Sequence, residues 1–498
     1  MAFQTRKSNS QVTRISPTTY ARWRAEHAAQ IALREAPLTS EPSERLLQHV
    51  WLHQRLRRDA LRTLDGETVC ILHPGFLNRE AGPDFRQSIV RIGAGPVRVG
   101  DIEIDLRPEC WKQHHHHHNP AYANVCLHVV WERDSCPETE LPTVVLKDAL
   151  DAPIEELRLW LTGPALKEQP PNLAGQCAGP LRQLDLSSLE DLLRQAAHVR
   201  LEAKGAELEA TARQVGWERA LWEGLFAALG YKQNVWPMRR LAESLPQLAA
   251  ERPEAPLSTL EIQARLLGAS GLLPNDLGRE EQDSDEYLRH VWDYWWRERE
   301  ALADLVLPRA VWRFHGLRPA NQPQRRLALA AHWLSDPEWL MRLESWLTEE
   351  VPNSSLAQAL LARLQAPYDE YWSHHWTVKA APVAEPQPLL GLQRATDLAV
   401  NVILPWFWVR ASAGKNAAIV ARVEHRYFAW PAGEDNALLR QARARLFGGA
   451  SPFLPHTASV QQGFLQILRD FCDRSNALCE DCRLPSLVKE VCPLNKVV

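Results

Sequence analysis

Apolar positions near the start of the chain recur at the spacing of a helix. After Ser43, the side chains of Leu46, Leu47, Val50 and Trp51 recur every three or four residues, which places them on one face. The pattern therefore predicts an amphipathic helix that begins near Ser43.

Short runs of apolar and β-branched residues follow and predict strands. A Gly-rich loop, "GAG", joins two of them as a hairpin. Between the third and fourth runs, "RPECWKQHH" predicts one short helix, which "NPAY" ends. The runs are "TVCIL" (68–72), "DFRQSIVRI" (84–92), "PVRVGDIEIDL" (96–106), "NVCLHVVWE" (124–132) and "LPTVVLK" (141–147).

Changes in composition divide the chain into successive parts. Together they predict an α+β protein with an N-terminal αβββαβ core, a large mainly helical region and a C-terminal Cys cluster. The parts are a basic flexible arm (1–40), the core (41–150), a Pro/Gly connector (151–182), a helical domain (183–380) and a helical C-terminal region (381–498).

Acidic residues line one face of the 96–106 strand. Side chains alternate along a strand, so carboxylates share one face and apolar residues pack on the other. Asp84, at the start of the paired strand, is expected to converge on the same point. Two interpretations stay open, a solvated surface hairpin and a pocket for Mg²⁺ or Mn²⁺, because like charges in a row repel unless solvent or a cation neutralises them. The carboxylates are Asp101, Glu103 and Asp105, and the apolar residues are Ile102, Ile104 and Leu106.

A histidine run, "HHHHH", occupies residues 114–118. Histidine binds metals, transfers protons and donates to phosphate oxygens. We expect His114 and His116 to have a site role, the other three to form a solvated loop, and His128 to be a core residue.

Composition and charge limit the classes of function. The chain is 45% hydrophobic and 24% charged, with a net charge of −4, so no global field attracts nucleic acid. The first 62 residues differ, with eleven Lys/Arg against five Asp/Glu, and are either a solvated tail or a phosphate-binding arm. The most apolar run, "LAVNVILPWFWV", is too short and too broken to span a bilayer. A cytoplasmic protein is expected.

Four of the nine cysteines lie in the last 27 residues: Cys472, Cys479, Cys482 and Cys492. Their spacing, C-x6-C-x2-C-x9-C, lets two thiolates from one turn meet one metal, and four soft ligands suit Zn²⁺ or a [4Fe–4S] cluster. The first part of the spacing resembles the cluster loop of the endonuclease III-like DNA glycosylases, whose last spacing is shorter. Buried thiols without a metal are the alternative.

The order of elements, with "PD" at 83–84 and "EID" at 103–105, resembles the core of the PD-(D/E)XK nucleases. The resemblance implies that Asp84 and Glu103 are metal ligands. Asp105 stands where that pattern has a Lys, so Lys112 is a candidate for the missing positive charge. Glu44 or Gln48 on the first helix is a candidate for a further oxygen ligand.

Almost the whole chain also resembles an uncharacterised bacterial domain-of-unknown-function family, number 2851. Its matching stretches include "NREAGPDF", "VGDIEIDL", "WKQHHHHHNPAYANVCLHVVWERD", "LRPANQPQRRLA" and the terminal "QQGFLQILRDFC". The family usually carries His where Asp105 stands. This resemblance implies a shared fold and supplies no function.

The leading functional hypothesis is a metal-dependent phosphodiesterase that acts on DNA or RNA. Asp84, Glu103 and Asp105 would serve the metal, and Lys112, His114 or His116 would steer water or stabilise charge. Arg318, Arg325 and Arg326 are candidate phosphate contacts. Two alternatives are a catalytically degenerate nuclease fold that binds nucleic acid or protein, and a hydrolase with another substrate.

Overall fold

The computed structural model describes residues 15–35, 41–78, 81–133, 141–161, 173–250, 256–274, 286–448, 452–472, 479 and 482–491. The chain divides into two compact units. The sheet unit contains residues 40–161 and 204–427, and the terminal unit contains residues 1–39, 162–203 and 428–498. Each unit therefore combines segments that are far apart in the sequence, whereas the sequence predicted successive parts.

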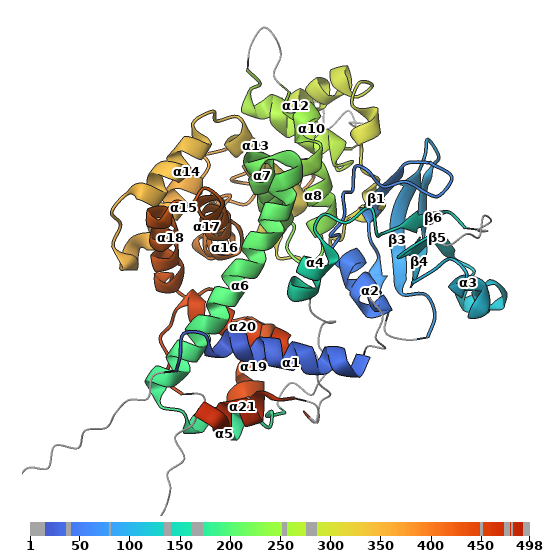
Figure 1. Cartoon of the computed structure of the whole chain (residues 1–498). Coiled ribbons are helices and arrows are strands. Elements are labelled where there is room, and N and C mark those ends of the chain that lie inside the picture. The colour runs from blue at the N-terminus through green and yellow to red at the C-terminus, as the bar shows by residue number, and fades with distance from the viewer. Residues whose placement is uncertain are drawn as a thin grey trace, which may run out of the picture. The chain divides into compact units, whose positions relative to one another are not determined.

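A mixed six-stranded sheet forms the N-terminal part of the sheet unit (Figure 1). The spatial order is β1-β3-β4-β5-β6, and β2 pairs with β3 off this path. The pairs β1–β3 and β3–β4 are antiparallel, whereas β4–β5 and β5–β6 are parallel. The strands are β1 (Val69–His73), β2 (Phe76–Leu77), β3 (Phe85–Ile92), β4 (Val97–Asp105), β5 (Val125–Val130) and β6 (Thr143–Val145).

The predicted hairpin is β3–β4. Gly93, with φ +55°, begins its turn, a conformation that glycine adopts without steric cost. At the other end of the hairpin, Phe85 pairs with Ile102, and a bulge separates this pair from the pairing of Ser88 with Gly100. This register brings the start of β3, where Asp84 lies, beside the last residues of β4.

The two faces of β4 follow the predicted alternation. Ile102 and Ile104 are buried in the apolar core of the sheet unit, with Trp51 of the helix α2 (Glu44–Leu52) and Phe85 of β3. Glu103 points to the opposite face, yet it is only 7% exposed. Of the two interpretations left open, the solvated hairpin therefore does not describe the end of this strand, where Asp105 is also buried.

Short helical turns make the crossover from β4 to β5. They are α3 (Cys110–Gln113), the 3₁₀ turn η1 (His116–His118) and the 3₁₀ turn η2 (Pro120–Tyr122). His115, between the first two, has φ +58°, so the chain reverses within the histidine run. The crossover carries Trp111 and His116, which are both buried.

Helices make up the remainder of the sheet unit, and α8 contacts β1. Ser43 caps α2 by accepting a hydrogen bond from the Leu46 amide, so the predicted helix start is confirmed. The helices are α2 (Glu44–Leu52), α4 (Ile154–Trp160), the second part of α6 (Leu186–Val215), α7 (Trp217–Leu229), α8 (Val235–Glu243), α9 (Leu245–Leu248), α10 (Thr259–Ala269), α12 (Glu286–Glu298), α13 (Pro323–Leu334), α14 (Trp339–Thr348), α15 (Leu356–Leu364), α16 (Leu392–Leu398), the π-helix η7 (Ala399–Ile403), α17 (Leu404–Ala413) and α18 (Ala417–Ala429).

The terminal unit is helical, and its α5, α19, α20 and α21 lie together (Figure 1). Part of the predicted flexible arm is the helix α1, in which Tyr20 and Trp23 are fully buried. The Tyr20 hydroxyl donates to Asp470 Oδ2 at 2.8 Å, so α1 belongs to the core of this unit. The helices are α1 (Thr19–Glu35), α5 (Ala178–Gln183), the first part of α6, α19 (Ala437–Phe447), α20 (Ala458–Ile467), the π-helix η8 (Leu468–Cys472) and α21 (Leu484–Val491).

Across the described ranges, no helix combines the length and the apolar character that spanning a membrane requires.

Candidate metal site at the end of the sheet

Asp84 and Glu103 meet where β3 begins and β4 ends. The Asp84 amide donates to Glu103 Oε2 at 3.1 Å. Asp84 Oδ2 accepts from the Ile104 amide at 3.0 Å, and its Oδ1 accepts from Gln48 Nε2 of α2 at 2.8 Å. The two acids therefore lie on one side of the hairpin, as their spacing predicted, and Gln48 joins them from the first helix.

Asp105 lies among three imidazole rings. Its Oδ2 is 2.9 Å from His128 Nε2, and its Oδ1 is 3.5 Å from His114 Nδ1. Beside this pair, His116 Nδ1 lies 3.5 Å from Glu103 Oε1. The parallel pairing of β4 with β5 places His128 opposite Glu103, so two neighbouring strands supply one cluster.

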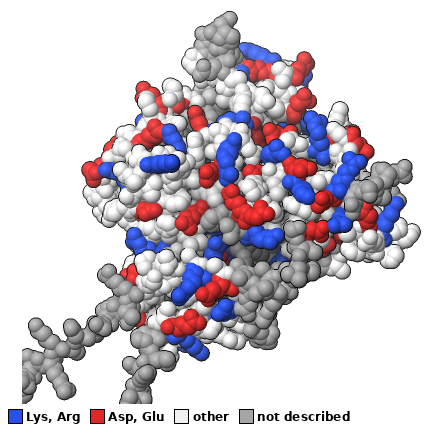
Figure 2. All heavy atoms as spheres, in the orientation of Figure 1, with Lys and Arg blue, Asp and Glu red and all other residues white. Residues whose placement is uncertain are grey.

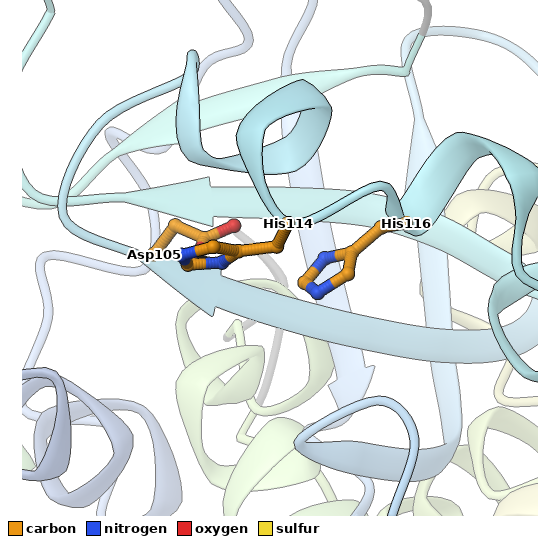
Figure 3. A group of neighbouring side chains, drawn as sticks. All are labelled: Asp105, His114 and His116. Atoms are coloured by element: carbon orange, nitrogen blue, oxygen red, sulfur yellow. Dashed lines mark ion pairs between the residues drawn. The ribbon is translucent and has the colours of Figure 1, made fainter.

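Three side chains of this cluster converge as metal ligands do. One ligand atom each from Asp105, His114 and His116 lies within 4.8 Å of the other two (Figure 3). Asp105 comes from the end of β4, and both imidazoles come from the crossover turns. His116 Nδ1 is buried without a hydrogen-bond partner in the described structure. A cation would satisfy that nitrogen, so the residues present fit a divalent metal.

The carboxyl groups resist ionisation where they stand. Burial, and then the charges of Asp84 and Asp105, raises the pKa of Glu103 to about 9. Burial, and then the charges of Asp105 and Glu44, raises the pKa of Asp84 to about 7, although the Ile104 amide opposes this. Glu44 of α2 also has a raised pKa, from burial and then from Asp105. A cation placed here would take over the role of the bound protons.

Aromatic rings hold the histidines in place. Trp111 is buried, and its ring meets His116 edge-on, with centroids 5.3 Å apart, and lies 5.6 Å from His128. The Tyr122 ring stacks on His116 at 4.0 Å. Burial lowers the pKa of His116, which keeps its imidazole in the neutral form that binds metals. Trp111 is therefore a structural residue and not an exposed platform for a base.

The other candidates from the sequence do not join this cluster. Lys112 on α3 is exposed, and among the described residues no hydrogen bond or ion pair links it to the acids. Arg325 and Arg326 on α13 are buried and donate to backbone carbonyl groups, including those of Gln387 and Leu389. Their expected role as phosphate contacts is therefore corrected to a structural one.

Arg318, which precedes α13, is exposed. On the face that Figure 2 shows, the Lys and Arg side chains of described residues are interspersed with Asp and Glu. Among the described residues of the sheet unit on that face, no large patch of one sign is visible that would attract a polyanion.

His128 is the core histidine that the sequence predicted, 2% exposed and with its Nε2 2.9 Å from Asp105 Oδ2. The sequence did not show that its partner is a carboxylate of the site. Tyr122 carries no sequence signal, because only the crossover turns bring it onto His116. Burial, and then the charges of Glu103, Asp84 and Asp105, raises the pKa of Tyr122 to about 12.

Fold and site together define a mixed α+β protein with a carboxylate–histidine cluster at one end of its sheet. Residues 44–436 match the model of the family described as "Protein of unknown function (DUF2851)". The chain therefore belongs to this family, as the sequence resemblance implied. The match ends before "QQGFLQILRDFC", which the resemblance included. No curated protein and no solved structure matches the chain.

Proposed function

We propose that the sheet unit is a divalent-metal-dependent phosphodiesterase, related in fold to the PD-(D/E)XK nucleases, that acts on DNA or RNA. The observation that carries the proposal is the group of Asp105, His114 and His116 directly beside Asp84 and Glu103. The order α2, β1, β3, β4, α3, β5 supports it, since it matches the αβββαβ order of that superfamily.

The donor set indicates which metals fit. Carboxylates suit Mg²⁺ and Mn²⁺, whereas imidazoles suit later transition metals. A site with two imidazoles and one carboxylate, flanked by further carboxylates, therefore favours Mn²⁺ over Mg²⁺. A bound cation would supply Lewis-acid stabilisation of a phosphoryl oxygen and a lowered pKa for a coordinated water.

The protein's own residues would divide the remaining work. Asp105 is 3% exposed and is oriented by His128, so its position is fixed before any substrate arrives. The His114 side chain is 50% exposed, so it is the member that a substrate phosphate can reach. The ring nitrogen that does not bind the metal would donate a hydrogen bond to that phosphate. Glu103 and Asp84, held by each other and by β4, would balance the charge behind it.

A degenerate nuclease fold that binds nucleic acid or protein is the second candidate. Asp105 occupies the position of the usual Lys, and Lys112 is exposed. A core without a positive group beside the acids lacks one way of activating water. This candidate predicts metal or ligand binding without turnover.

Metal binding and cleavage are tested in one variant series. Mn²⁺ affinity would be measured by calorimetry, and cleavage of plasmid, single-stranded DNA and RNA by gel assay, for wild type, Asp105→Asn and His114→Gln. We expect each variant to lose at least about 100-fold in affinity, more than the 10–100-fold typical of an outer-shell partner. Cleavage should be lost with it.

His117→Gln is the matched control, because His117 is an exposed member of the same run and contacts His118. A histidine run binds metals adventitiously, so the control separates this effect from the site. Equal losses in His114→Gln and His117→Gln would refute the site. Tight Mn²⁺ binding that depends on Asp105, without cleavage of any of the three substrates, would favour the degenerate fold.

A further inference from the structure

Four cysteines meet in the terminal unit, and one of them is far from the others in sequence. Cys472 ends the π-helix η8, and Cys479 and Cys482 precede α21. Cys177 lies just before α5, almost 300 residues upstream of Cys472. The predicted fourth ligand, Cys492, lies outside the described residues.

Gly175 marks how closely two of these sulfurs approach. A Cβ atom at this position would lie 3.3 Å from Cys177 Sγ and 3.7 Å from Cys479 Sγ, so the two sulfurs are no more than about 7 Å apart. The same atom would lie 3.0 Å from the Arg445 carbonyl oxygen. A side chain at position 175 would therefore crowd the sulfurs of Cys177 and Cys479, and glycine avoids this contact.

The other two thiols lie in the same part of the terminal unit. Cys177 and Cys472 belong to one apolar core, and Cys482 packs against that core. The Cys482 amide donates to the Cys479 carbonyl oxygen at 3.3 Å, so these two cysteines share one tight turn. Three segments therefore bring their thiols to one place in this core.

The surroundings suit a charged metal–thiolate group. Cys177, Cys472 and Cys479 are each at most 5% exposed. Arg445 of α19 is fully buried, and its Nη2 donates to Cys479 Sγ at 3.0 Å. A guanidinium that donates to a ligand sulfur offsets the negative charge of a thiolate cluster and fixes the orientation of the ligand.

We propose that Cys177, Cys472, Cys479 and Cys482 bind one [4Fe–4S] cluster. The proposal is independent of the phosphodiesterase activity. It replaces Cys492 of the sequence prediction with Cys177, and it draws its ligands from three separate segments of the terminal unit.

The separation of the sulfurs favours the cluster over a single zinc ion. Zn–S bonds of about 2.3 Å in a tetrahedral site place the four sulfurs about 3.8 Å from one another. Within the described part of the chain, no three of these thiols lie within 4.8 Å of one another, because the only such group of ligand atoms is Asp105, His114 and His116. Sulfurs that bind four different irons of a cubane are further apart than sulfurs that share one ion.

The position of the site indicates what the cluster does. The ligands join the start of α5, the end of η8 and the segment before α21. Two residues before Cys472, Asp470 accepts hydrogen bonds from Tyr20 and Arg24 of α1. Loss of the cluster would therefore loosen α21 first and α1 next, since metal binding contributes directly to the folding free energy of such a site.

The full-length protein, expressed with iron and purified without oxygen, provides the test. We expect a brown protein that absorbs at about 400 nm and contains about four irons and four acid-labile sulfides per chain. Cys177→Ser should lose most of the iron, whereas Cys492→Ser and the control Cys70→Ser, a half-buried thiol in β1, should keep it. Stoichiometric zinc without iron, no metal at all, or loss of iron in Cys492→Ser with retention in Cys177→Ser would overturn the proposal.

Wild-type protein gives a second measurement if Cys177→Ser does not fold. Alkylation with iodoacetamide, followed by peptide mass spectrometry, is compared before and after the iron is removed with ferricyanide and a chelator. Labelling of Cys177 should rise at least tenfold on iron removal, whereas labelling of Cys492 and Cys70 should stay the same. Equal labelling of Cys177 in both samples would overturn the assignment.

Discussion

Replacing Glu103 with Gln should stabilise the metal-free protein at neutral pH. Glu103 has a folded-state pKa of about 9 against an ordinary value of 4.5. Between these values the folded protein holds a proton that the unfolded chain has released. Stability is therefore unaffected by this group below about pH 4.5 and falls as the pH rises toward about 9. Glutamine is neutral throughout, so Glu103→Gln removes this dependence.

The size of the effect follows from the pKa difference. Between pH 4.5 and 9, the free energy of unfolding falls by about 1.4 kcal/mol for each pH unit, because the folded protein must keep a proton on Glu103. At pH 7 this group therefore lowers the free energy of unfolding by about 3 kcal/mol. The glutamine oxygen can still accept the hydrogen bond from the Asp84 amide. We therefore expect the variant to gain most of that amount.

Denaturant unfolding between pH 5 and 9, followed by tryptophan fluorescence, measures the effect in protein treated with chelator. The midpoint of wild type should fall with pH, and that of Glu103→Gln should fall less. Saturating Mn²⁺ should remove or reverse the difference, because the cation replaces the proton in wild type. Glu132→Gln is the control, since Glu132 is a half-exposed partner of Lys147 in the same unit. Parallel pH profiles for wild type and Glu103→Gln would refute the inference that burial and the neighbouring carboxyl groups raise the pKa of Glu103.

Three further predictions concern single side chains. His128→Ala should weaken Mn²⁺ binding by about 10–100-fold without abolishing it, because His128 orients Asp105; calorimetry that shows unchanged affinity would contradict this. Trp111→Ala should lower the free energy of unfolding by about 3–5 kcal/mol, as expected for a buried aromatic, and chemical denaturation measures it. Arg325→Ala should lower the free energy of unfolding by about 3 kcal/mol or more, because the substitution leaves buried carbonyl groups without a donor. In the fraction that folds, filter binding should show the same nucleic-acid affinity as wild type.

Local pattern by itself determined the elements around the site. The apolar stripe after Ser43 predicted α2, and alternation along 96–106 separated Ile102 and Ile104 from Glu103 and Asp105. These predictions hold because helix and strand periodicities are properties of neighbouring residues. The approach of Asp84 to Glu103 could be predicted for the same reason, because a short hairpin fixes which residues face each other.

Burial and long-range partners were decided only by the tertiary structure. Adjacent arginines such as Arg325 and Arg326 are typical of a basic surface in sequence. Only the packing of α13 against the 372–389 segment buries them and pairs them with backbone carbonyl groups. At the end of β4, Asp105 contacts His114 and Glu103 contacts His116, and both histidines come from the crossover turns. In the terminal unit, Cys177 meets Cys479 although 302 positions separate them. Spacing in sequence reports distance only within one turn or hairpin, whereas contacts across hundreds of residues depend on how whole helices pack.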